Sequence, residues 1–276
     1  MDDKQIFASV EVCDHEVRMV VGEFFSPRLN ILKVEMIPCS GLSYNTINNA
    51  DEIISAIETA CKQTEQMLSA KLEKVILSIP SYQMQRKSVR VTVPVKGYDG
   101  VVSVQDIRNA MKLAERQVSI GKELALVQTV CVKYTIDGIA SRRIPIGERA
   151  KELVVDIDLL CADRQLAYSL VGCIEKAGLQ VMDIYLDTYA AAKEAALFEQ
   201  SVDRNVVLLK MEREATTVAR LSKGKLMEST IVYDKCGLTN LRKERAKYFY
   251  ISHDKRVFDV VTYNPPIIEK ILKRYE

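Results

Sequence analysis

Cys13, Asp14 and His15 place a thiol, a carboxylate and an imidazole on three consecutive residues, between two apolar runs of the chain. A thiol and an imidazole can bind zinc, or can act together as a nucleophile and its general base. Either chemistry needs further groups, yet no second histidine or cysteine cluster lies nearby, and the other histidine, His253, is in the C-terminal tail. We therefore expect a polar hairpin turn beside a strand cysteine, with no metal site and no catalytic residue.

A second concentration of charge, formed by Glu212, Arg213 and Glu214, also lies between two apolar runs. These residue types suit either an exposed recognition loop or a solvated turn with local ion pairs. We expect the solvated turn, although a tight turn needs no charges and a role in recognition stays open.

The C-terminal tail, residues 242–276, carries nine Lys or Arg against five Asp or Glu. Within it, residues 267–275 repeat apolar side chains at helical spacing, with Lys and Arg on the other face. Such a helix could lie on a membrane surface or pack on its own domain, and we expect packing because it is short. The basic run at residues 242–247 is too short and too mixed in charge to predict nucleic-acid binding.

The overall composition is that of a globular protein of 276 residues, with 48% apolar and 28% charged residues. The net charge of +2 divides into −4 for residues 1–200 and +6 for the rest. The seven cysteines never form a CxxC pair, which indicates reduced thiols in the cytosol. The N-terminus does not resemble a signal peptide, and no apolar run approaches the ~18 residues of a membrane span. We therefore expect a soluble protein of the cytoplasm. Its 11 glycines, about 4% against a usual share of about 7%, are unusually few.

The elements that position these residues can be read from apolar periodicity. The first part of the chain predicts three strands, a helix with a capping box at its start, and a buried parallel strand: residues 5–12, 17–23, 30–38, 51–69 and 74–79. The middle predicts strands and one helix: residues 87–95, 104–117, 125–136 and 152–160. A helix capped by Gly178, a strand and an alanine-rich helix follow: residues 163–176, 180–186 and 188–199.

After a polar break near residue 201, the opening pattern returns as three more strands, at residues 205–211, 216–221 and 225–232. A strand triplet repeated about 200 residues apart indicates a duplicated half-domain. Two such halves, each opening with a hairpin, would face each other across a cleft.

This order of elements resembles the actin-like ATPase superfamily and, within it, the bacterial cell-division protein FtsA family. The most specific stretch is residues 170–195, LVGCIEKAGLQVMDIYLDTYAAAKEA. Residues 21–42, 50–85 and 132–157 are similar to further blocks of that family, in the same order. The resemblance covers residues 6–241 and implies an α/β, actin-like (ribonuclease H-like) fold with an inserted small α+β subdomain. It divides the chain into a first subdomain, an inserted subdomain and a partial second half: residues 1–82 with 161–200, residues 83–160, and residues 201–276.

In that family two hairpin turns hold the nucleotide phosphates, because glycines let backbone N–H groups approach them and aspartates organise Mg²⁺. The first family turn reads approximately D-I-G-T-S-K, and the matching residues are Glu11, Val12, Cys13, Asp14, His15 and Glu16. Cysteine replaces the phosphate-facing glycine and glutamate replaces the lysine. A carboxylate about 4 Å from a phosphate charge costs about 4 kcal/mol at an effective dielectric constant of about 20.

The second family turn reads approximately D-I-G-G-G-T-T-D. The matching residues are Lys210, Met211, Glu212, Arg213, Glu214, Ala215, Thr216 and Thr217. All three glycines are replaced by long charged side chains, and both flanking aspartates are absent. The resemblance therefore implies a lost nucleotide site, and we expect neither ATP nor Mg²⁺ as a cofactor. Part of the glycine shortage falls at these two turns.

The family extends much further, with a subdomain that contacts the cell-division tubulin homologue FtsZ and a C-terminal amphipathic helix that reaches the membrane. The sequence leaves open whether this chain is a fragment or is naturally short. We expect a non-catalytic scaffold or adaptor that binds FtsZ-like or other cell-division proteins, and itself, through strand edges and the inserted subdomain. It would work in the cytoplasm, at the inner face of the membrane or the division site, with at most peripheral membrane contact and no nucleic acid. The alternatives are an ATP-binding member with unusual turns and a pilus-assembly-type adaptor, which shares this fold.

Overall fold

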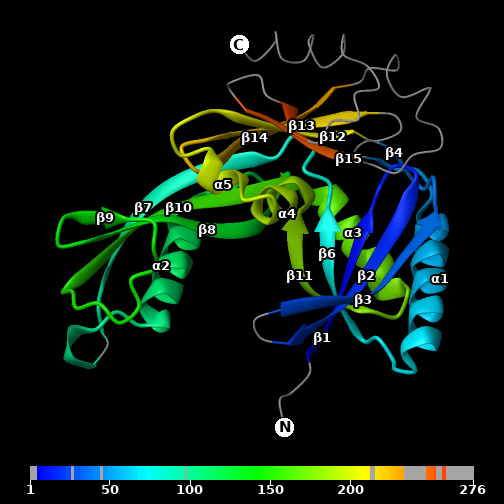
Figure 1. Cartoon of the computed structure of the whole chain (residues 1–276), viewed down its shortest axis with the longest axis horizontal. Coiled ribbons are helices and arrows are strands. Elements are labelled where there is room, and N and C mark those ends of the chain that lie inside the picture. Colours follow the sequence, from blue (N-terminus) through cyan, green and yellow to red (C-terminus); the bar gives the residue numbers. More distant parts are fainter. Residues whose placement is uncertain are drawn as a thin grey trace. The chain divides into compact units, whose positions relative to one another are not determined.

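The computed structural model describes residues 5–25, 28–43, 46–96, 98–211, 215–232, 247–252 and 257–258. It is a mixed α/β protein (Figure 1) whose contacts form two compact units. The first unit combines Met1–Gln83 with Leu166–Glu276, and the second is Met84–Gln165. The C-terminal strands therefore group with the first unit, and the three-part division drawn from the sequence stays a prediction.

The first unit opens with a five-stranded sheet in the order β11-β6-β1-β2-β3. Its strands are β1 (Gln5–Val12), β2 (Glu16–Phe25), β3 (Arg28–Pro38), β6 (Lys74–Ile79) and β11 (Gln180–Leu186). The first three strands form an antiparallel meander, whereas β6 runs parallel to both β1 and β11, as the short apolar run predicted. Alternate residues of β1 and β2 are buried, which is the two-residue period of a strand with one face on a core. Two short strands, β4 (Leu42–Ser43) and β5 (Thr46–Ile47), pair beside this sheet.

Helix α1 (Ala50–Leu68) packs against β2 and β3 (Figure 1). Asn49 caps its N-terminus, since the Asn49 side chain accepts a hydrogen bond from Glu52 N at 3.1 Å. The Glu52 carboxylate accepts from Ser40 N at 2.7 Å, so it ties the helix to the segment before it. The half of the predicted capping box in which the Asn49 side chain accepts from the helix backbone is therefore observed. The Glu52 carboxylate accepts from Ser40 N instead of completing the other half.

Helix α3 (Arg164–Lys176) precedes β11 in the sequence, and α4 (Asp187–Glu194) and α5 (Leu197–Gln200) follow it. Gly178 follows α3 with φ +84°, and its N–H bonds Glu175 O at 3.0 Å, which confirms the predicted glycine cap. The prediction of one continuous helix at residues 188–199 was wrong. Ala196 adopts φ +52°, a left-handed conformation that interrupts the helix and separates α4 from α5.

A second sheet in the first unit has the order β14-β13-β12-β15-β16. It contains β12 (Val206–Met211), β13 (Thr216–Ser222), β14 (Lys225–Val232), β15 (Lys247–Ser252) and β16 (Val257–Phe258). Strands β12, β13 and β14 repeat the antiparallel meander of β1, β2 and β3, as the sequence predicted. The strand that pairs with the other side of the first strand differs between the two sheets. In the first sheet β6 runs parallel to β1, whereas in the second sheet β15 runs antiparallel to β12.

The second unit is an antiparallel sheet in the order β7-β10-β8-β9, covered on one face by helix α2. Its elements are β7 (Gln85–Pro94), the 3₁₀ turn η1 (Tyr98–Gly100), α2 (Val104–Gln117), β8 (Leu124–Ile136), β9 (Ile139–Ser141) and β10 (Glu152–Asp163). Alternate apolar residues of β7 and β10 pack with Ala110 and Ala114 of α2 to form its core. Strand β10 extends three residues beyond the predicted end at residue 160.

Ser103 and Asp106 form a complete capping box at the start of α2. The Ser103 hydroxyl accepts from Asp106 N at 3.3 Å, and the Asp106 carboxylate accepts from Ser103 N at 2.9 Å. We expect Ser103→Ala to lower the free energy of unfolding by about 1 kcal/mol, because a helix N–H loses its acceptor. Urea unfolding measures this change, with the exposed Arg108→Ala as control, for which about 0.5 kcal/mol or less is expected. Equal losses in the two variants would contradict the assignment of this cap.

Candidate functional site

The first predicted turn joins β1 to β2 and is closed by a hydrogen bond from Cys13 N to Glu16 O at 2.9 Å. Cys13 is buried, and Asp14 is 9% exposed. The turn is anchored to the sheet beyond it, because Cys39 N bonds His15 O at 3.0 Å. The predicted hairpin turn is observed, although Cys13 lies just after the end of β1 and not within the strand.

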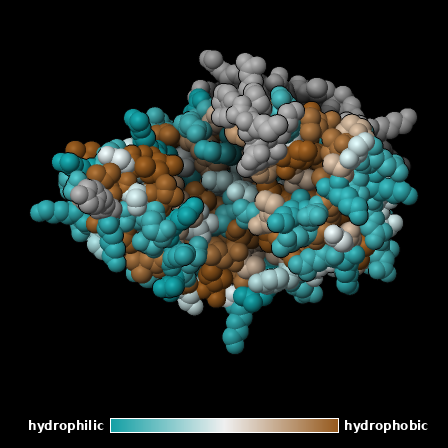
Figure 2. Space-filling model, turned by 90° about the horizontal axis from the view of Figure 1, so that it is seen from below, coloured by the Kyte–Doolittle hydropathy of each residue, from teal (hydrophilic) through white to brown (hydrophobic). Residues whose placement is uncertain are grey.

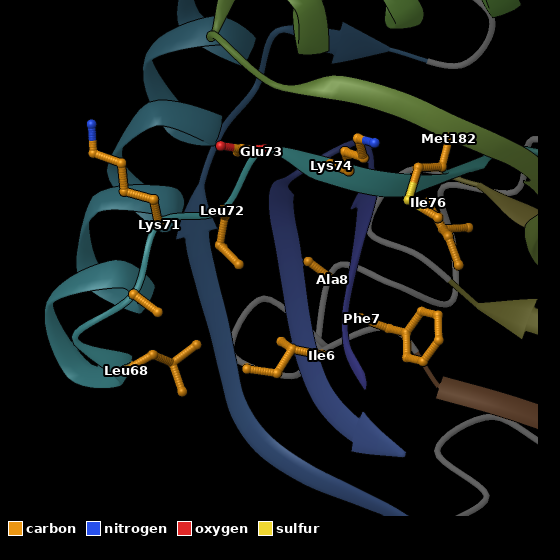
Figure 3. A pocket seen from close by; sticks show the side chains of 11 residues that line it. Ile6, Phe7, Ala8, Leu68, Lys71, Leu72, Glu73, Lys74, Ile76 and Met182 are labelled. Carbon is orange, nitrogen blue, oxygen red and sulfur yellow. The ribbon is translucent and has the colours of Figure 1, made fainter. Parts of the chain in front are cut away.

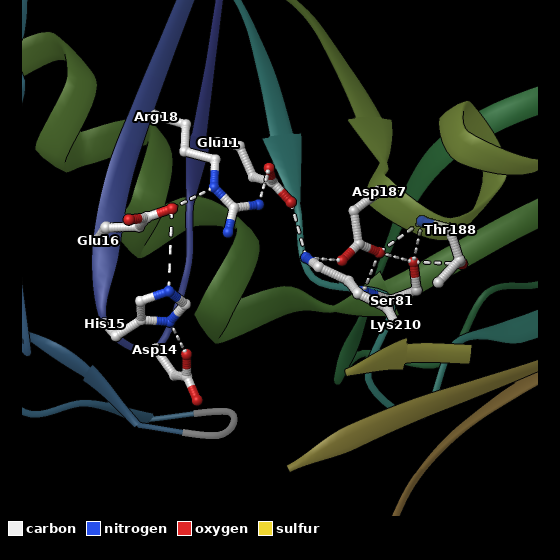
Figure 4. Close-up of polar contacts among 9 residues, drawn as sticks. All are labelled: Glu11, Asp14, His15, Glu16, Arg18, Ser81, Asp187, Thr188 and Lys210. Atoms are coloured by element: carbon white, nitrogen blue, oxygen red, sulfur yellow. Dashed lines mark hydrogen bonds and ion pairs between the residues drawn. The ribbon is translucent and has the colours of Figure 1, made fainter. Parts of the chain in front are cut away.

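The side chains of this turn form a row in which carboxylates alternate with basic side chains (Figure 4). His15 Nδ1 lies 2.5 Å from Asp14 Oδ1, and His15 Nε2 lies 3.8 Å from Glu16 Oε1. The same Glu16 oxygen accepts from Arg18 Nε at 2.6 Å. Within the described ranges, no three His, Cys, Asp or Glu side chains are grouped so that they could hold a metal ion. The turn is thus an ion-pair cluster in which His15 is held between two carboxylates.

The second predicted turn joins β12 to β13. Ala215 and Thr216, at its end, are 2% and 5% exposed, and Thr217 is buried beside them. Glu212, Arg213 and Glu214 lie outside the described residues, so the expectation of a solvated turn there stays a prediction. The predicted tail helix at residues 267–275 also lies outside the described part of the chain.

Lys210 connects the two hairpins. It lies near the end of β12, and it is the last residue before this turn whose side chain the structure describes. Its ammonium Nζ lies 2.7 Å from Glu11 Oε1 and 2.6 Å from Asp187 Oδ2. Glu11 is on β1, 199 positions away in the sequence, and its other oxygen accepts from Arg18 Nη1 at 3.0 Å. The side chains of Lys210 and Asp187 are each only 1% exposed. A lysine in the second sheet is therefore bound by carboxylates of the first sheet and of α4 (Figure 4).

Asp187 is the first residue of α4, where backbone N–H groups favour a negative charge. Its Oδ1 accepts from Thr188 N at 2.6 Å, from Ser81 N at 2.9 Å and from the Ser81 hydroxyl. The Thr188 hydroxyl in turn bonds Ser81 Oγ at 2.6 Å. Asp187 thus holds three segments together: the chain after β6, the start of α4, and Lys210 on β12.

We call these nine residues the charged network: Glu11, Asp14, His15, Glu16, Arg18, Ser81, Asp187, Thr188 and Lys210. Burial alone raises the pKa of Glu11, but the Lys210 ammonium and the Arg18 guanidinium outweigh burial and lower it to about 2. Burial alone lowers the pKa of Arg18, yet the nearby Cys13, Glu11 and Glu16 raise it well above its usual range. Both side chains therefore stay charged at neutral pH, and the network acts as a cross-link between the two hairpins.

Sequence reasoning placed Cys13, Asp14, His15 and Glu16 correctly in one turn but missed the residues that join the two hairpins. Arg18, Ser81 and Asp187 were not singled out, and Lys210 was noted only as a lost aspartate. A signal was present in the sequence. Glu11 and Lys210 are opposite charges in otherwise apolar strands, and both match the aspartate that begins a family turn.

The hydrogen bond to Asp14 raises the pKa of His15. Burial lowers this pKa, but the negative charges of Asp14 and Glu16 raise it further, so the net shift is upward. We expect a His15 titration midpoint above about 6.5, measured by NMR of the imidazole, and a lower midpoint in the Asp14→Asn variant. Because the folded pKa is raised, the stabilisation by His15 is complete below pH about 6.5 and is lost as the pH rises through the folded pKa. The same midpoint in both proteins would contradict this role of Asp14.

An apolar groove of about 570 Å³ lies elsewhere in the first unit (Figure 3). Strands β1 and β6 pair only along Ser9–Glu11 and Ile76–Ser78, and the groove opens before this paired stretch. Its lining is mainly apolar, with Lys71, Glu73 and Lys74 in the loop and strand after α1: Ile6, Phe7, Ala8, Leu68, Ala70, Lys71, Leu72, Glu73, Lys74, Ile76 and Met182. None of these residues belongs to the charged network, so the groove is a separate feature that the sequence analysis did not predict.

Comparison with known proteins confirms the resemblance seen in the sequence, although no family model matches the chain. The cell-division protein FtsA of Bacillus subtilis (strain 168) is 26% identical over 232 residues, which cover 84% of this chain and 52% of that protein. FtsA of Neisseria meningitidis serogroup B is 24% identical over 234 residues, 84% of this chain and 56% of that protein. The chain thus spans about half the length of the curated relatives it matches.

Among solved structures, a chain of the PilM–PilN type IV pilus biogenesis complex superposes with a TM-score of 0.52 and 14% identity. The match covers 82% of this chain and 61% of that chain, and it supports the fold alone. In the described part of the chain, no helix has the length and apolar character to cross a bilayer. The sequence relatives and the fold together lead to one conclusion: this chain is an FtsA-like protein with the fold of the actin-like ATPases.

Proposed function

We propose that this chain is a non-catalytic scaffold of bacterial cell division, in which the Lys210 ammonium takes the place of the Mg²⁺-bound nucleotide that the family resemblance implies between the two hairpins. The observation that supports it most is the position of Lys210. Its ammonium is buried and lies within 2.7 Å of a carboxylate oxygen of Glu11 and of Asp187. This contact would join the two hairpins in place of a bound nucleotide.

The charge of Lys210 also argues against a bound metal. The resemblance matches Glu11 and Lys210 to the aspartates that begin the two family turns, so carboxylate has been kept at one position and exchanged for ammonium at the other. A unit positive charge about 4 Å from another costs about 4 kcal/mol at an effective dielectric constant of about 20, and Mg²⁺ carries two. The Lys210 ammonium is already the cation that the carboxylates of Glu11 and Asp187 share, so Mg²⁺ would have to displace it.

The residues of the first turn do not fit a polyphosphate either. Cys13 stands where the family has the glycine that lets the backbone approach a phosphate, and Asp14 and Glu16 add two carboxylates. These carboxylates contact His15 Nδ1 and Arg18 Nε, so the basic groups of the turn already have acidic partners of their own. We therefore propose that neither ATP nor Mg²⁺ is a cofactor and that the chain is a pseudo-ATPase.

A scaffold of this kind would keep its hairpins joined at all nucleotide concentrations. Its partners would be cell-division proteins, with FtsZ as the first candidate, and its place would be the division site on the cytoplasmic side of the membrane. The sequence relatives are named for cell division, which favours this role over a pilus-assembly adaptor, for which the likeness is one of fold alone.

Co-sedimentation with polymerised, purified FtsZ tests the partner. We expect this chain to pellet with FtsZ polymers to the same extent with and without millimolar Mg-ATP, and to stay in solution when FtsZ is omitted. Every sample contains GTP, which keeps FtsZ polymerised, so the samples that are compared differ only in Mg-ATP. Pelleting that requires Mg-ATP would contradict the nucleotide-free scaffold, and no pelleting under either condition would remove FtsZ as the partner.

A further inference from the structure

The second unit has an exposed apolar tip, residues 137–149, which contains the turn between β8 and β9, β9 itself and the loop after it. Asp137 and Gly138 adopt φ +48° and +80° and form the two-residue turn of the hairpin. Three isoleucines of the tip are more than half exposed: Ile139 77%, Ile144 54% and Ile146 51%. Figure 2 shows hydrophobic residues exposed among hydrophilic ones on the face seen from below. Clustered apolar side chains at a surface mark a contact with a protein or with a membrane.

The loop of the tip is held in place by hydrogen bonds, so the exposure of its isoleucines is built into the fold. Gly147 N donates to Val102 O at 3.0 Å, and Val102 N donates to Glu148 O at 2.9 Å. Glu148 N in turn donates to Pro145 O at 3.1 Å. Pro145 is buried, whereas the isoleucines on both sides of it are exposed. The proline thus anchors the loop and leaves its two apolar neighbours at the surface.

Positive charge accompanies these apolar side chains. Arg142 and Arg143 are exposed and lie between Ile139 and Ile144 in the sequence. The second unit, residues 84–165, has 14 Lys or Arg against 10 Asp or Glu and thus a net charge of +4. The rest of the chain has 25 against 27, a net charge of −2. The apolar tip therefore belongs to the basic part of the protein, and its charge is complementary to an anionic surface.

These features fit an anionic lipid bilayer better than a protein partner. Charged residues are depleted from the core of protein interfaces, where the binding energy comes mainly from Trp, Tyr and Arg side chains seated in pockets. Here Arg142 and Arg143 interrupt the apolar side chains, and residues 136–151 contain no aromatic residue. A bilayer accepts this arrangement, because aliphatic side chains enter the acyl boundary while the arginines stay among the headgroup phosphates.

The geometry points to the apolar tip as a membrane-binding surface: Ile139, Ile144 and Ile146 enter an anionic bilayer, and Arg142 and Arg143 bind its lipid phosphates. The tip lies in the second unit, whereas the C-terminal tail belongs to the first, so this contact is distinct from the one that the resemblance implies for the family's C-terminal helix. It uses none of the residues of the charged network, so it stands or falls independently of the proposed loss of nucleotide binding.

Flotation of the full chain with lipid vesicles tests this surface. We expect binding to phosphatidylcholine vesicles that contain about 30% phosphatidylglycerol, and weaker binding to phosphatidylcholine alone or in high salt, which screens surface charge. Arg142→Glu with Arg143→Glu should lower the partition coefficient about 25-fold or more, at about fivefold for each arginine lost near an anionic surface. Ile144→Ser with Ile146→Ser should lower it about tenfold or more, because less apolar area leaves water.

Matched pairs in the first unit control for charge and for hydrophobicity. Lys62→Glu with Lys193→Glu makes the same change in net charge, and Leu29→Ser with Ile31→Ser removes apolar side chains that are 57% and 55% exposed. Both pairs should bind anionic vesicles nearly as the parent does. A parent that does not bind these vesicles, or tip variants that bind as the parent does, would overturn the proposal. Tip variants that lose pelleting with FtsZ but keep vesicle binding would assign the surface to a protein and would also overturn it.

A fluorescent probe gives a second readout at the tip itself. The chain contains no tryptophan, so Ile144→Trp introduces a single indole and keeps the position apolar. With anionic vesicles we expect its emission to shift to shorter wavelength and to be quenched by lipids brominated on the acyl chain, because the indole leaves water. Ile31→Trp, at a residue of nearly the same exposure (55% against 54%), is the matched control and should change in neither way. Equal changes at both positions, or no change at the tip, would overturn the proposal.

Discussion

Lys210→Met is expected to lower the free energy of unfolding by about 3–5 kcal/mol, the usual cost of removing one partner from a buried ion pair. Methionine has nearly the length of lysine, so the loss reports the charge and not a cavity. Without the ammonium, the carboxylates of Glu11 and Asp187 lose their common partner, and Asp187 stays almost fully buried. Urea unfolding followed by circular dichroism measures the change.

Two further variants make this result specific to the network. Lys193→Met changes an exposed lysine, 65% accessible and 3.8 Å from Glu199, and should cost about 1 kcal/mol or less. Adding Asp187→Asn to Lys210→Met neutralises the buried carboxylate that has lost its cation and should recover part of the loss, whereas Glu11 keeps its ion pair with Arg18. A loss at Lys210 no larger than that at Lys193 would contradict the view that this lysine joins the two hairpins.

Acidification is expected to remove a second large contribution, through Glu11. Its folded pKa is about 2, against about 4.5 when it is not paired. Because the folded pKa is the lower one, the stabilisation is complete above pH about 4.5 and is lost as the pH falls toward 2. At about 1.4 kcal/mol per pKa unit, the contribution at neutral pH is about 3 kcal/mol.

Comparison of the parent with Glu11→Gln separates Glu11 from the other carboxylates, which titrate in both proteins. We expect the parent to be more stable by about 3 kcal/mol at pH 7, and this difference should shrink steadily between pH 4.5 and 2. Urea midpoints measured at pH 7, 5, 4, 3 and 2.5 provide the curve. A difference between the two proteins that does not change with pH would contradict a lowered pKa at Glu11.

Much of the fold could be predicted because it depends on local periodicity. Apolar runs of strand length placed β1 and β6, and Ser103 and Gly178 marked helix ends through hydrogen bonds made within a few residues. The break at Ala196 could not be predicted in this way. An alanine-rich stretch has high helix propensity, and the left-handed φ of Ala196 is not encoded in that local preference.

The charged network could be predicted only in part, for a related reason. Asp14, His15 and Glu16 are neighbours in the sequence, so their contacts follow from one turn. Lys210 and Glu11 are 199 positions apart, and nothing in either apolar run indicates that the other faces it. A charge in an apolar strand does, however, require a partner when it is buried. The resemblance matched both residues to family turns that hold one nucleotide, but it did not predict a contact between their side chains.

If Lys210 takes the place of a Mg²⁺-bound nucleotide, the folded protein should not bind Mg-ATP, and thermal unfolding with and without millimolar Mg-ATP measures this binding. A ligand at 100 times its dissociation constant stabilises the folded state by about 2.7 kcal/mol, which raises the unfolding midpoint measurably. Samples with Mg²⁺ alone control for the effect of the ion. We expect the same midpoint with Mg-ATP as with Mg²⁺ alone, whereas a midpoint that rises with Mg-ATP concentration and saturates would show that the nucleotide site is intact.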